Sequence, residues 1–190
     1  MNQALSSAGI VLAQAVITLA TFAFLLRFIL QAVRADFYNP ITQAIVRITD
    51  PVLKPTRKLI PPISGLDVAS LLITLLLQLA LVFLLFYGIS PVTAVVLASF
   101  RLLNQVLTFY FFTMFIVVIL SWVAPGSRHP GAELVHQVTE PVLAPFRRLI
   151  PPVGGLDLSI MVAFLVLIVL RDYLLPGIAF EIGIGRSALD

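Results

Sequence analysis

The stretches of sequence that decide the fold are TDPVLKPTRKLIPPISGLD at residues 49–67 and TEPVLAPFRRLIPPVGGLD at residues 139–157. They align without a gap at an offset of 90 residues, and 13 of their 19 positions are identical. Self-similarity at a fixed period indicates an internal repeat. The same offset also matches residues of the surrounding apolar sequence: Pro40 with Pro130, Phe22 with Phe112 and Thr18 with Thr108. The duplication therefore covers the flanking segments as well as the motif.

The amino-acid composition places most of the chain in a lipid bilayer. Of the 190 residues, 60% are hydrophobic and 11% are charged, and the mean hydropathy is +1.08. Soluble domains carry about 25% charged residues, so this chain has too few charges to build a water-soluble surface. A spanning helix needs about 20 apolar residues. Four segments approximate that length: Ile10–Val33, Val68–Tyr87, Leu102–Val123 and Leu158–Leu175.

These observations predict an all-α membrane protein with about four transmembrane helices, built as two parallel repeats of helix, interfacial motif and helix. The first repeat covers residues 10–87, a connecting segment covers 88–101, and the second repeat covers 102–175. Residues 88–105 leave an alternative open. Their apolar part, Val92–Phe100, is too short to span a bilayer, so we interpret it as a connecting turn with an early start of the third helix. A fifth span is the competing interpretation, and it would invert the second repeat.

The basic residues predict how the spans are oriented. With two spans in each repeat, both motif segments lie on one face of the membrane, and they hold eight of the twelve basic residues: Arg34, Arg47, Lys54, Arg57, Lys58, Arg128, Arg147 and Arg148. The positive-inside rule then predicts cytoplasmic motif loops and both termini outside. The same rule accounts for the net charge of +3, so no nucleic acid is predicted as a partner.

Each motif predicts a short helix that lies along the membrane surface. Thr49-Asp50 can cap such a helix, Pro51 fits its first turn, and Pro61-Pro62 end it after about ten residues. A helix of that length is unstable alone in water. Apolar side chains such as Leu53, and their counterparts in the second copy, can face the acyl chains while the cations face phosphate. We therefore expect amphipathic interfacial segments that contact anionic headgroups.

The charged residues of the motif are the candidate contacts with lipids or with a partner. They are Arg57, Lys58 and Asp67 in the first repeat and Arg147, Arg148 and Asp157 in the second. The simplest interpretation assigns the arginines to headgroups and the aspartates to the N-caps of the following helices. A second interpretation pairs Arg57 with Asp67 and Arg147 with Asp157, which would fix the re-entry of the chain into the membrane or form a recognition surface. A third assigns these residues to a substrate.

One arginine, Arg27, falls inside the first predicted span. A charge within a membrane is a functional candidate by default. However, Arg27 lies only about 10 Å from the cytoplasmic end of the helix. Its side chain can therefore snorkel to the surface or pair with a neighbouring helix. The counterpart of Arg27 in the second repeat is Val117, so the charge is not part of the duplicated scaffold.

The sequence predicts no catalytic, cofactor-binding or metal-binding residue. It has no cysteine, its two histidines, His129 and His136, have no nearby set of further ligands, and no histidine lies in a predicted span. Neither a Walker loop nor a G-x-S-x-G or H-E-x-x-H motif occurs. We therefore expect that the protein is not an enzyme.

The duplicated motif resembles that of the YggT family, also called YlmG-like. The resemblance covers nearly the whole chain and includes residues 27–31 (RFILQ), 36–40 (DFYNP) and 121–122 (SW). The two-repeat form resembles the proteobacterial members, which implies a multi-pass protein of the inner (plasma) membrane. It also implies links to osmotic or ion homeostasis, to envelope and division loci and, in plastids, to cytochrome assembly and nucleoid organisation. It implies no reaction.

Two functions from different classes fit these expectations. The first is a non-enzymatic membrane scaffold or assembly factor, whose basic amphipathic motifs hold anionic lipids or a membrane-protein partner. The alternative is a channel or transport component in osmotic or ion homeostasis. Because four helices with few polar groups in the membrane do not line a pore alone, that alternative requires a homo-oligomer. We favour the scaffold.

Overall fold

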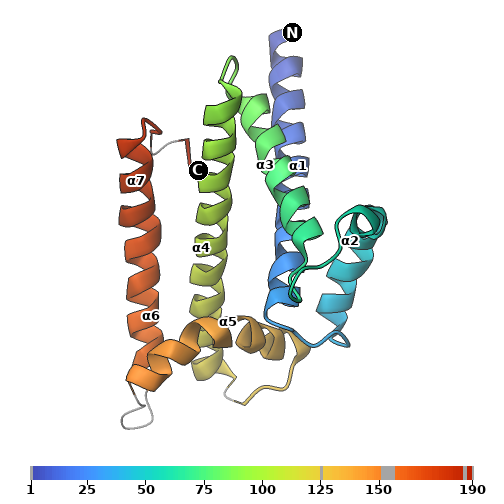
Figure 1. The fold of residues 1–190 in the computed structure, drawn as a ribbon. Helices are drawn as coiled ribbons and strands as arrows, with labels where there is room; N and C mark the ends of the chain where they lie inside the picture. The colour runs from blue at the N-terminus through green and yellow to red at the C-terminus, as the bar shows by residue number, and fades with distance from the viewer. Residues whose placement is uncertain (1, 125, 151–156, 186–187, 190) are drawn as a thin grey trace. The chain divides into compact units, whose positions relative to one another are not determined.

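The computed structural model describes residues 2–124, 126–150, 157–185 and 188–189, with side chains from Ala8 onward. Helices account for nearly all of its regular structure (Figure 1). In chain order they are α1 (Asn2–Ala32), α2 (Pro40–Leu59), α3 (Val68–Leu85), α4 (Pro91–Val123), α5 (Pro130–Leu149), α6 (Leu158–Ile168), the π-helix η1 (Val169–Leu174) and α7 (Leu175–Glu181).

Four helical segments are long and apolar enough to cross a membrane, which confirms the predicted all-α membrane fold with four spans. They are Ala8–Ala32, Val68–Leu85, Pro91–Val123 and Leu158–Glu181. The last of them joins α6, η1 and α7 into one continuous segment.

Helix α4 begins earlier than the span that the sequence predicts, at Pro91 and not at Leu102. A turn with Gly88 at φ +76° precedes it, and the Ser90 hydroxyl accepts a hydrogen bond from the Thr93 N–H at 3.2 Å. The apolar stretch Val92–Phe100 is therefore the first part of α4. It makes no separate fifth span among the described residues.

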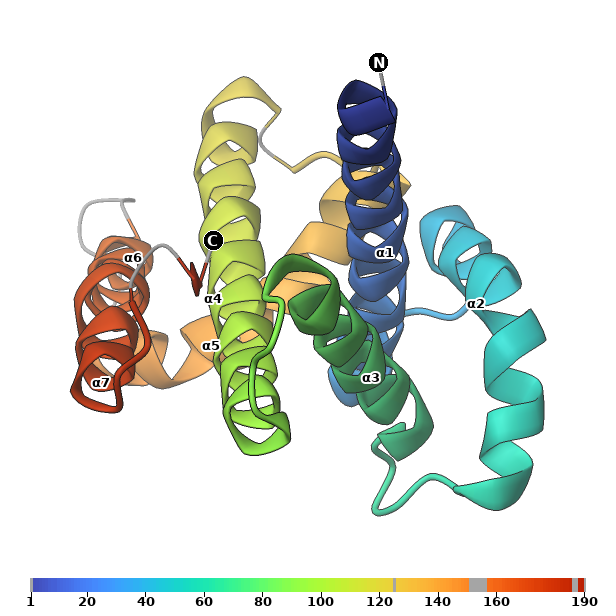
Figure 2. The same cartoon turned by 90° about the horizontal axis from the view of Figure 1, so that it is seen from above.

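The chain divides into two compact units, which are described separately. The first comprises the residues up to Ala32 together with Ile45–Leu102, and the second comprises Val33–Ala44 together with Leu103–Leu189. In the first unit α1 and α3 lie side by side (Figure 2). Phe24 of α1, Leu53 of α2 and Ala69 of α3 form the core between them.

The fully buried side chain of Leu53 corrects the expectation that it faces the acyl chains. One face of α2 packs on α1 and α3, so Leu53 points into protein and not into lipid. In the second unit α5 lies crosswise to α6 (Figure 1). There Leu143 of α5 is buried with Met114 of α4 and Ala163 of α6, so its predicted exposure to lipid is also wrong.

Helix α2 is one continuous helix of 20 residues, whereas the sequence predicts a separate short helix starting near Pro51. The chain is capped earlier, at Asn39, whose side-chain oxygen accepts from the Ile41 N–H at 2.9 Å. Proline has a φ that fits a helix, but it removes one backbone donor and its ring crowds the carbonyl four residues earlier, so Pro51 and Pro55 within α2 favour a bend. Figure 2 shows that α2 bends along its length, as prolines cause.

The predicted end of the motif helix is confirmed, because α2 ends at Leu59, just before the two prolines. A tight turn then reverses the chain, with Ile63 and Leu66 exchanging backbone hydrogen bonds of 3.1 and 2.9 Å. Ser64 and Gly65 occupy the turn at φ +54° and +84°. Glycine adopts such angles at no steric cost, which explains its place in the motif.

Candidate functional site

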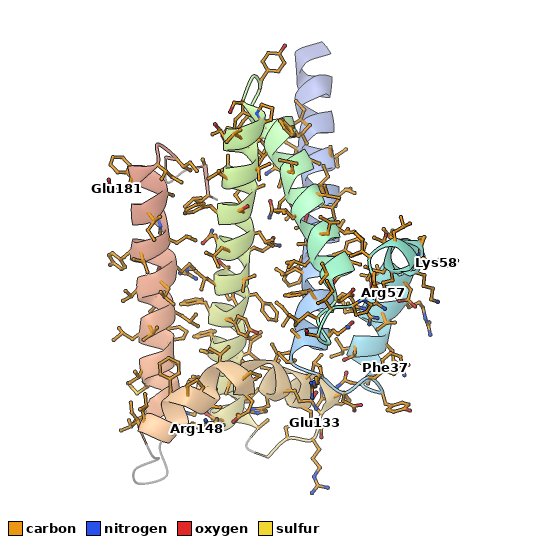
Figure 3. The ribbon with its side chains drawn as sticks, in the orientation of Figure 1. Phe37, Arg57, Lys58, Glu133, Arg148 and Glu181 are labelled. Atoms are coloured by element: carbon orange, nitrogen blue, oxygen red, sulfur yellow. The ribbon has the colours of Figure 1, made fainter. Side chains whose placement is uncertain are left out.

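The end of α2 is joined to the start of α3 by a bidentate ion pair between Arg57 and Asp67. Arg57 Nε donates to Asp67 Oδ1 at 3.2 Å, and Arg57 Nη2 donates to Asp67 Oδ2 at 2.5 Å. The Asp67 side chain is fully buried, whereas Arg57 is 26% exposed. We call this pair, with the turn that it encloses, the first elbow. Figure 3 shows Arg57 and Lys58 together at the end of α2.

Asp67 also caps α3, as the sequence predicts. Its Oδ1 accepts from the Ser70 N–H at 3.4 Å, and the Ser70 hydroxyl donates to the Asp67 carbonyl at 2.9 Å. Burial by itself raises the pKa of the Asp67 carboxyl. The hydrogen bonds and the charge of Arg57, helped by Ser70, outweigh burial, so the pKa lies below its ordinary value. The carboxylate is therefore held in its charged form.

Gln31, at the end of α1, contacts both the Arg57 side chain and the turn of the first elbow. Its side-chain oxygen accepts from Arg57 Nη2 at 3.1 Å, and its amide nitrogen donates to the Gly65 carbonyl at 3.4 Å. Three helices therefore meet at a single guanidinium. This closure was not predicted, because nothing in the sequence indicates that Gln31 lies beside the motif turn.

Arg27 pairs with a neighbouring helix, one of the alternatives that the sequence leaves open. Its Nη2 lies 3.9 Å from Asp50 Oδ1 on α2, and the Lys54 ammonium lies 3.1 Å from Asp50 Oδ2. The Arg27 side chain is only 11% exposed. Together with the ion pair of the first elbow, this cluster contains three cations and two carboxylates.

In the second repeat the corresponding ion pair joins the end of α5 to the start of α6. Arg147 Nε donates to Asp157 Oδ2 at 2.9 Å, and Arg147 Nη1 also pairs with Glu140. Asp157 caps α6 by accepting from the Ser159 N–H at 3.1 Å and from its hydroxyl. Both aspartates of the motif are thus caps and ion-pair partners at once. We call this cluster the second elbow.

The ion pairs of the second elbow are more exposed than those of the first. Asp157 is 28% exposed and Arg147 is 36% exposed. Burial alone would raise the pKa of Asp157, but its hydrogen bonds with Ser159 and Arg147 and the charge of Arg147 lower it. The pKa of Arg147 is raised, since the two carboxylates outweigh burial. The guanidinium of Arg147 thus pairs with two carboxylates, those of Asp157 and Glu140.

The first elbow, taken together with Arg27, Asp50 and Lys54, therefore differs from the second elbow in charge. It also differs in the side chain that closes it. The counterparts of Arg27, Gln31 and Lys54 at the 90-residue offset are an apolar residue, a serine and an alanine: Val117, Ser121 and Ala144. The first cluster thus has an excess of one positive charge, and the second an excess of one negative charge. The remaining predicted contact residues, Lys58 and Arg148, point outward and form no ion pair among the described residues.

The loop between α1 and α2 contacts α5, a feature that the sequence analysis missed. The Asn39 side-chain nitrogen donates to the Pro130 carbonyl at 2.7 Å, and the Asp36 N–H donates to the Gln137 side-chain oxygen at 2.9 Å. Asn39 is also the N-cap of α2, and His129 caps α5 in the same way. The duplicated prolines, Pro40 and Pro130, were the available signal for these two helix starts, because Pro is favoured at the first position of a helix.

An arginine in the last span is also paired within the membrane. Arg171, in η1, donates to the neighbouring Asp172 at 2.7 and 3.1 Å. Its guanidinium carbon lies 4.0 Å from the centre of the Phe111 ring on α4, and Phe111 stacks on Phe164. The ion pair balances the two charges, and the ring contact places the guanidinium against protein.

Comparisons with known proteins agree with the duplicated architecture. The family model CCB3/YggT matches the chain twice, at residues 6–88 and 96–178. A Pseudomonas aeruginosa protein is 45% identical over an alignment of 189 residues that covers 96% of this chain and 96% of the relative. YggT of Escherichia coli K12 is 34% identical over 175 residues, covering 86% of this chain and 93% of YggT. No solved structure matches the chain significantly. The two matches fall on the two repeats, and the chain therefore belongs to the CCB3/YggT family.

Proposed function

We propose that this protein is a non-enzymatic scaffold or assembly factor of the inner membrane, which presents basic helices along the cytoplasmic surface to anionic lipids and to a membrane-protein partner. In this proposal the two elbows are structural joints that fix the helices α2 and α5 to the spans. Arg57, Asp67, Arg147 and Asp157 hold the joints together. Lys58 and Arg148 are the outward contacts.

The observation that carries the proposal is the division of α2 into three faces. Thr42, Thr49 and Leu53 form its buried face. An exposed apolar stripe follows at helical spacing, made of Ile41, Ile48, Val52 and Leu59. The exposed cations Arg47, Lys54 and Lys58 form a third stripe. A helix with this distribution can pack on protein, sink its apolar stripe into acyl chains and direct its cations to headgroups.

The charges of α2 suit a surface of anionic lipid. Each basic group near such a surface gains about 1 kcal/mol, so Arg47 and Lys58 together gain about 2 kcal/mol, and Lys54, which also pairs with Asp50, adds less. The joint matters for this interaction because a helix held in place has already lost its orientational freedom before lipid or partner binds. The positive-inside rule supports a cytoplasmic placement of this face.

A channel or transport component in osmotic or ion homeostasis is the second candidate. It is favoured by a row of buried polar side chains on one face of α3: Ser70, Thr74 and Gln78. However, the Thr74 and Ser70 hydroxyls donate to backbone carbonyls of their own chain at 2.7 and 2.9 Å. Because these hydroxyls already donate to backbone carbonyls, they do not need a chain of water molecules as partners. The scaffold is therefore the better-supported function.

Ion flux and crosslinking together test the proposal. Purified protein in liposomes is expected to give no flux above that of empty liposomes, with a known channel as the positive control. A photoreactive group on Lys58→Cys should then form a discrete protein adduct in native membranes. The chain has no cysteine of its own, so labelling is specific. The matched control is Leu165→Cys, on an exposed apolar position of α6, which should form no such adduct.

The result that favours the channel is equally concrete. Robust flux through the wild-type protein that Arg27→Leu abolishes would overturn the scaffold proposal. Equal adducts from Lys58→Cys and Leu165→Cys would remove the special role of the basic face. The Lys58→Cys adduct should also weaken when Arg47 and Lys54 are both replaced by glutamine, because the cations are proposed to make the contact.

A further inference from the structure

A cleft of about 370 Å³ lies at the second elbow, between the end of α4 and the start of α6. Its walls are mainly apolar, with Val118 on α4 and Ile160 and Met161 on α6. Ser121, Trp122 and Asp157 supply the polar atoms at its edge. Its volume is within the range of about 300–1,000 Å³ that is typical of small-molecule sites. All of these residues belong to the second unit.

At the edge of the cleft the second repeat has a serine, Ser121, where the first repeat has a glutamine, Gln31. In the first repeat Gln31 reaches across the elbow to Arg57 and to the Gly65 carbonyl. Its counterpart Ser121 is too short to do so, and its hydroxyl donates to the Val118 carbonyl of its own helix at 2.7 Å. The first elbow is thus bridged by a side chain that Ser121 does not replace in the second.

The charges at the cleft favour a cationic group. Arg147 serves both Asp157 and Glu140, so the second elbow lacks one positive charge. Trp122 is 80% exposed at the edge of the cleft, and an indole ring attracts ammonium groups. The apolar walls match an acyl chain.

We propose that this cleft binds one phospholipid whose headgroup carries an ammonium, with phosphatidylethanolamine as the probe. The ammonium compensates the carboxylates of Asp157 and Glu140, and the start of one acyl chain lies against Ile160 and Met161. The proposal depends only on the placement of the spans in a membrane. It therefore stands or fails separately from the scaffold function.

The single tryptophan of the chain makes the test direct. The full-length protein is reconstituted in phosphatidylcholine vesicles that contain an equal minor fraction of brominated phosphatidylethanolamine, phosphatidylglycerol or phosphatidylcholine. Bromine quenches the fluorescence of Trp122 only at short range. Brominated phosphatidylethanolamine is expected to quench about twofold more than brominated phosphatidylcholine, which corresponds to about 0.4 kcal/mol. Equal quenching by all three lipids, or stronger quenching by phosphatidylglycerol, would overturn the proposal.

Two variants assign the selectivity to the cleft. Ser121→Gln introduces the side chain that closes the first elbow and should reduce quenching by phosphatidylethanolamine to the phosphatidylcholine level. Met161→Ala removes part of the apolar wall at a 68% exposed position and should also lower it without affecting folding. The reciprocal control, Gln31→Ser, changes the first elbow and should leave the selectivity unchanged. Full selectivity in both cleft variants would show that the lipid binds elsewhere.

Discussion

Replacing Arg57 with methionine is expected to lower the free energy of unfolding by about 3 kcal/mol, whereas Arg147→Met should lower it by about 1 kcal/mol. The difference follows from burial. Arg57→Met leaves the fully buried carboxylate of Asp67 without its counter-ion. Asp157 is 28% exposed and keeps the hydrogen bonds of Ser159, so water and Ser159 stabilise it after Arg147 is lost.

Thermal unfolding in detergent micelles measures this difference. For a chain of this size, 1 kcal/mol corresponds to about 2–4 °C in Tm, so Arg57→Met should lower Tm by about 6–12 °C and Arg147→Met by less than half as much. Equal decreases would contradict the account, because they would mean that burial of Asp67 has no energetic consequence.

Acid provides a second readout of the same pair. The pKa of Asp67 is lower in the folded protein than in the unfolded chain, so its contribution to stability is complete above the ordinary pKa of about 3.9. The contribution is lost as the pH falls through the lowered pKa. Tm should therefore be flat from neutral pH down to about pH 5 and fall below it. The fall should be smaller in Asp67→Asn, which has no carboxylate to protonate at this site.

Leu53→Ala is expected to cost about 2–5 kcal/mol, the usual range for a leucine removed from a protein core. Leu53 is fully buried against Phe24 and Ala69. The matched control is Leu59→Ala on the same helix, where the side chain is 84% exposed and the expected loss is below about 0.5 kcal/mol. A motif helix whose leucines all faced lipid would give similar small losses at both positions. That result would contradict the packing of α2 described here.

The spans and their caps could be predicted from sequence because both depend on local chemistry. Apolar runs of about 20 residues identify spanning helices, and Asp67 and Asp157 stand immediately before two such runs, where an N-cap belongs. The early start of the third helix was also predicted, and α4 begins at Pro91, before the apolar run counted as the span from Leu102. A helix continues through polar residues when nothing in the backbone stops it.

The packing of the motif could not be predicted in the same way. The two prolines within α2 suggested a helix start, but Asn39 caps the helix one residue before Pro40. Periodicity separates apolar from charged faces, but it does not tell whether an apolar side chain such as Leu53 meets lipid or protein. That distinction depends on tertiary contacts.

The two ion pairs were one of three interpretations of the motif, and only coordinates could select it. Arg57 and Asp67 are ten residues apart with a reversing turn between them, so their spacing alone does not bring them together. The contacts of Gln31 and the cleft beside Ser121 could not be predicted from the sequence either. Both depend on tertiary contacts, because Gln31 reaches the motif turn of the first repeat and the cleft lies between α4 and α6.

In the proposed topology both motifs lie on one face of the membrane and the turn before α4 lies on the other. The most direct test labels single cysteines with an impermeant maleimide in right-side-out and inverted membrane vesicles. Lys58→Cys and Arg148→Cys should react only from the cytoplasmic side, and Ser90→Cys only from the opposite side. Reaction of Ser90→Cys from the same side as Lys58→Cys, or of the two motif cysteines from opposite sides, would contradict the account.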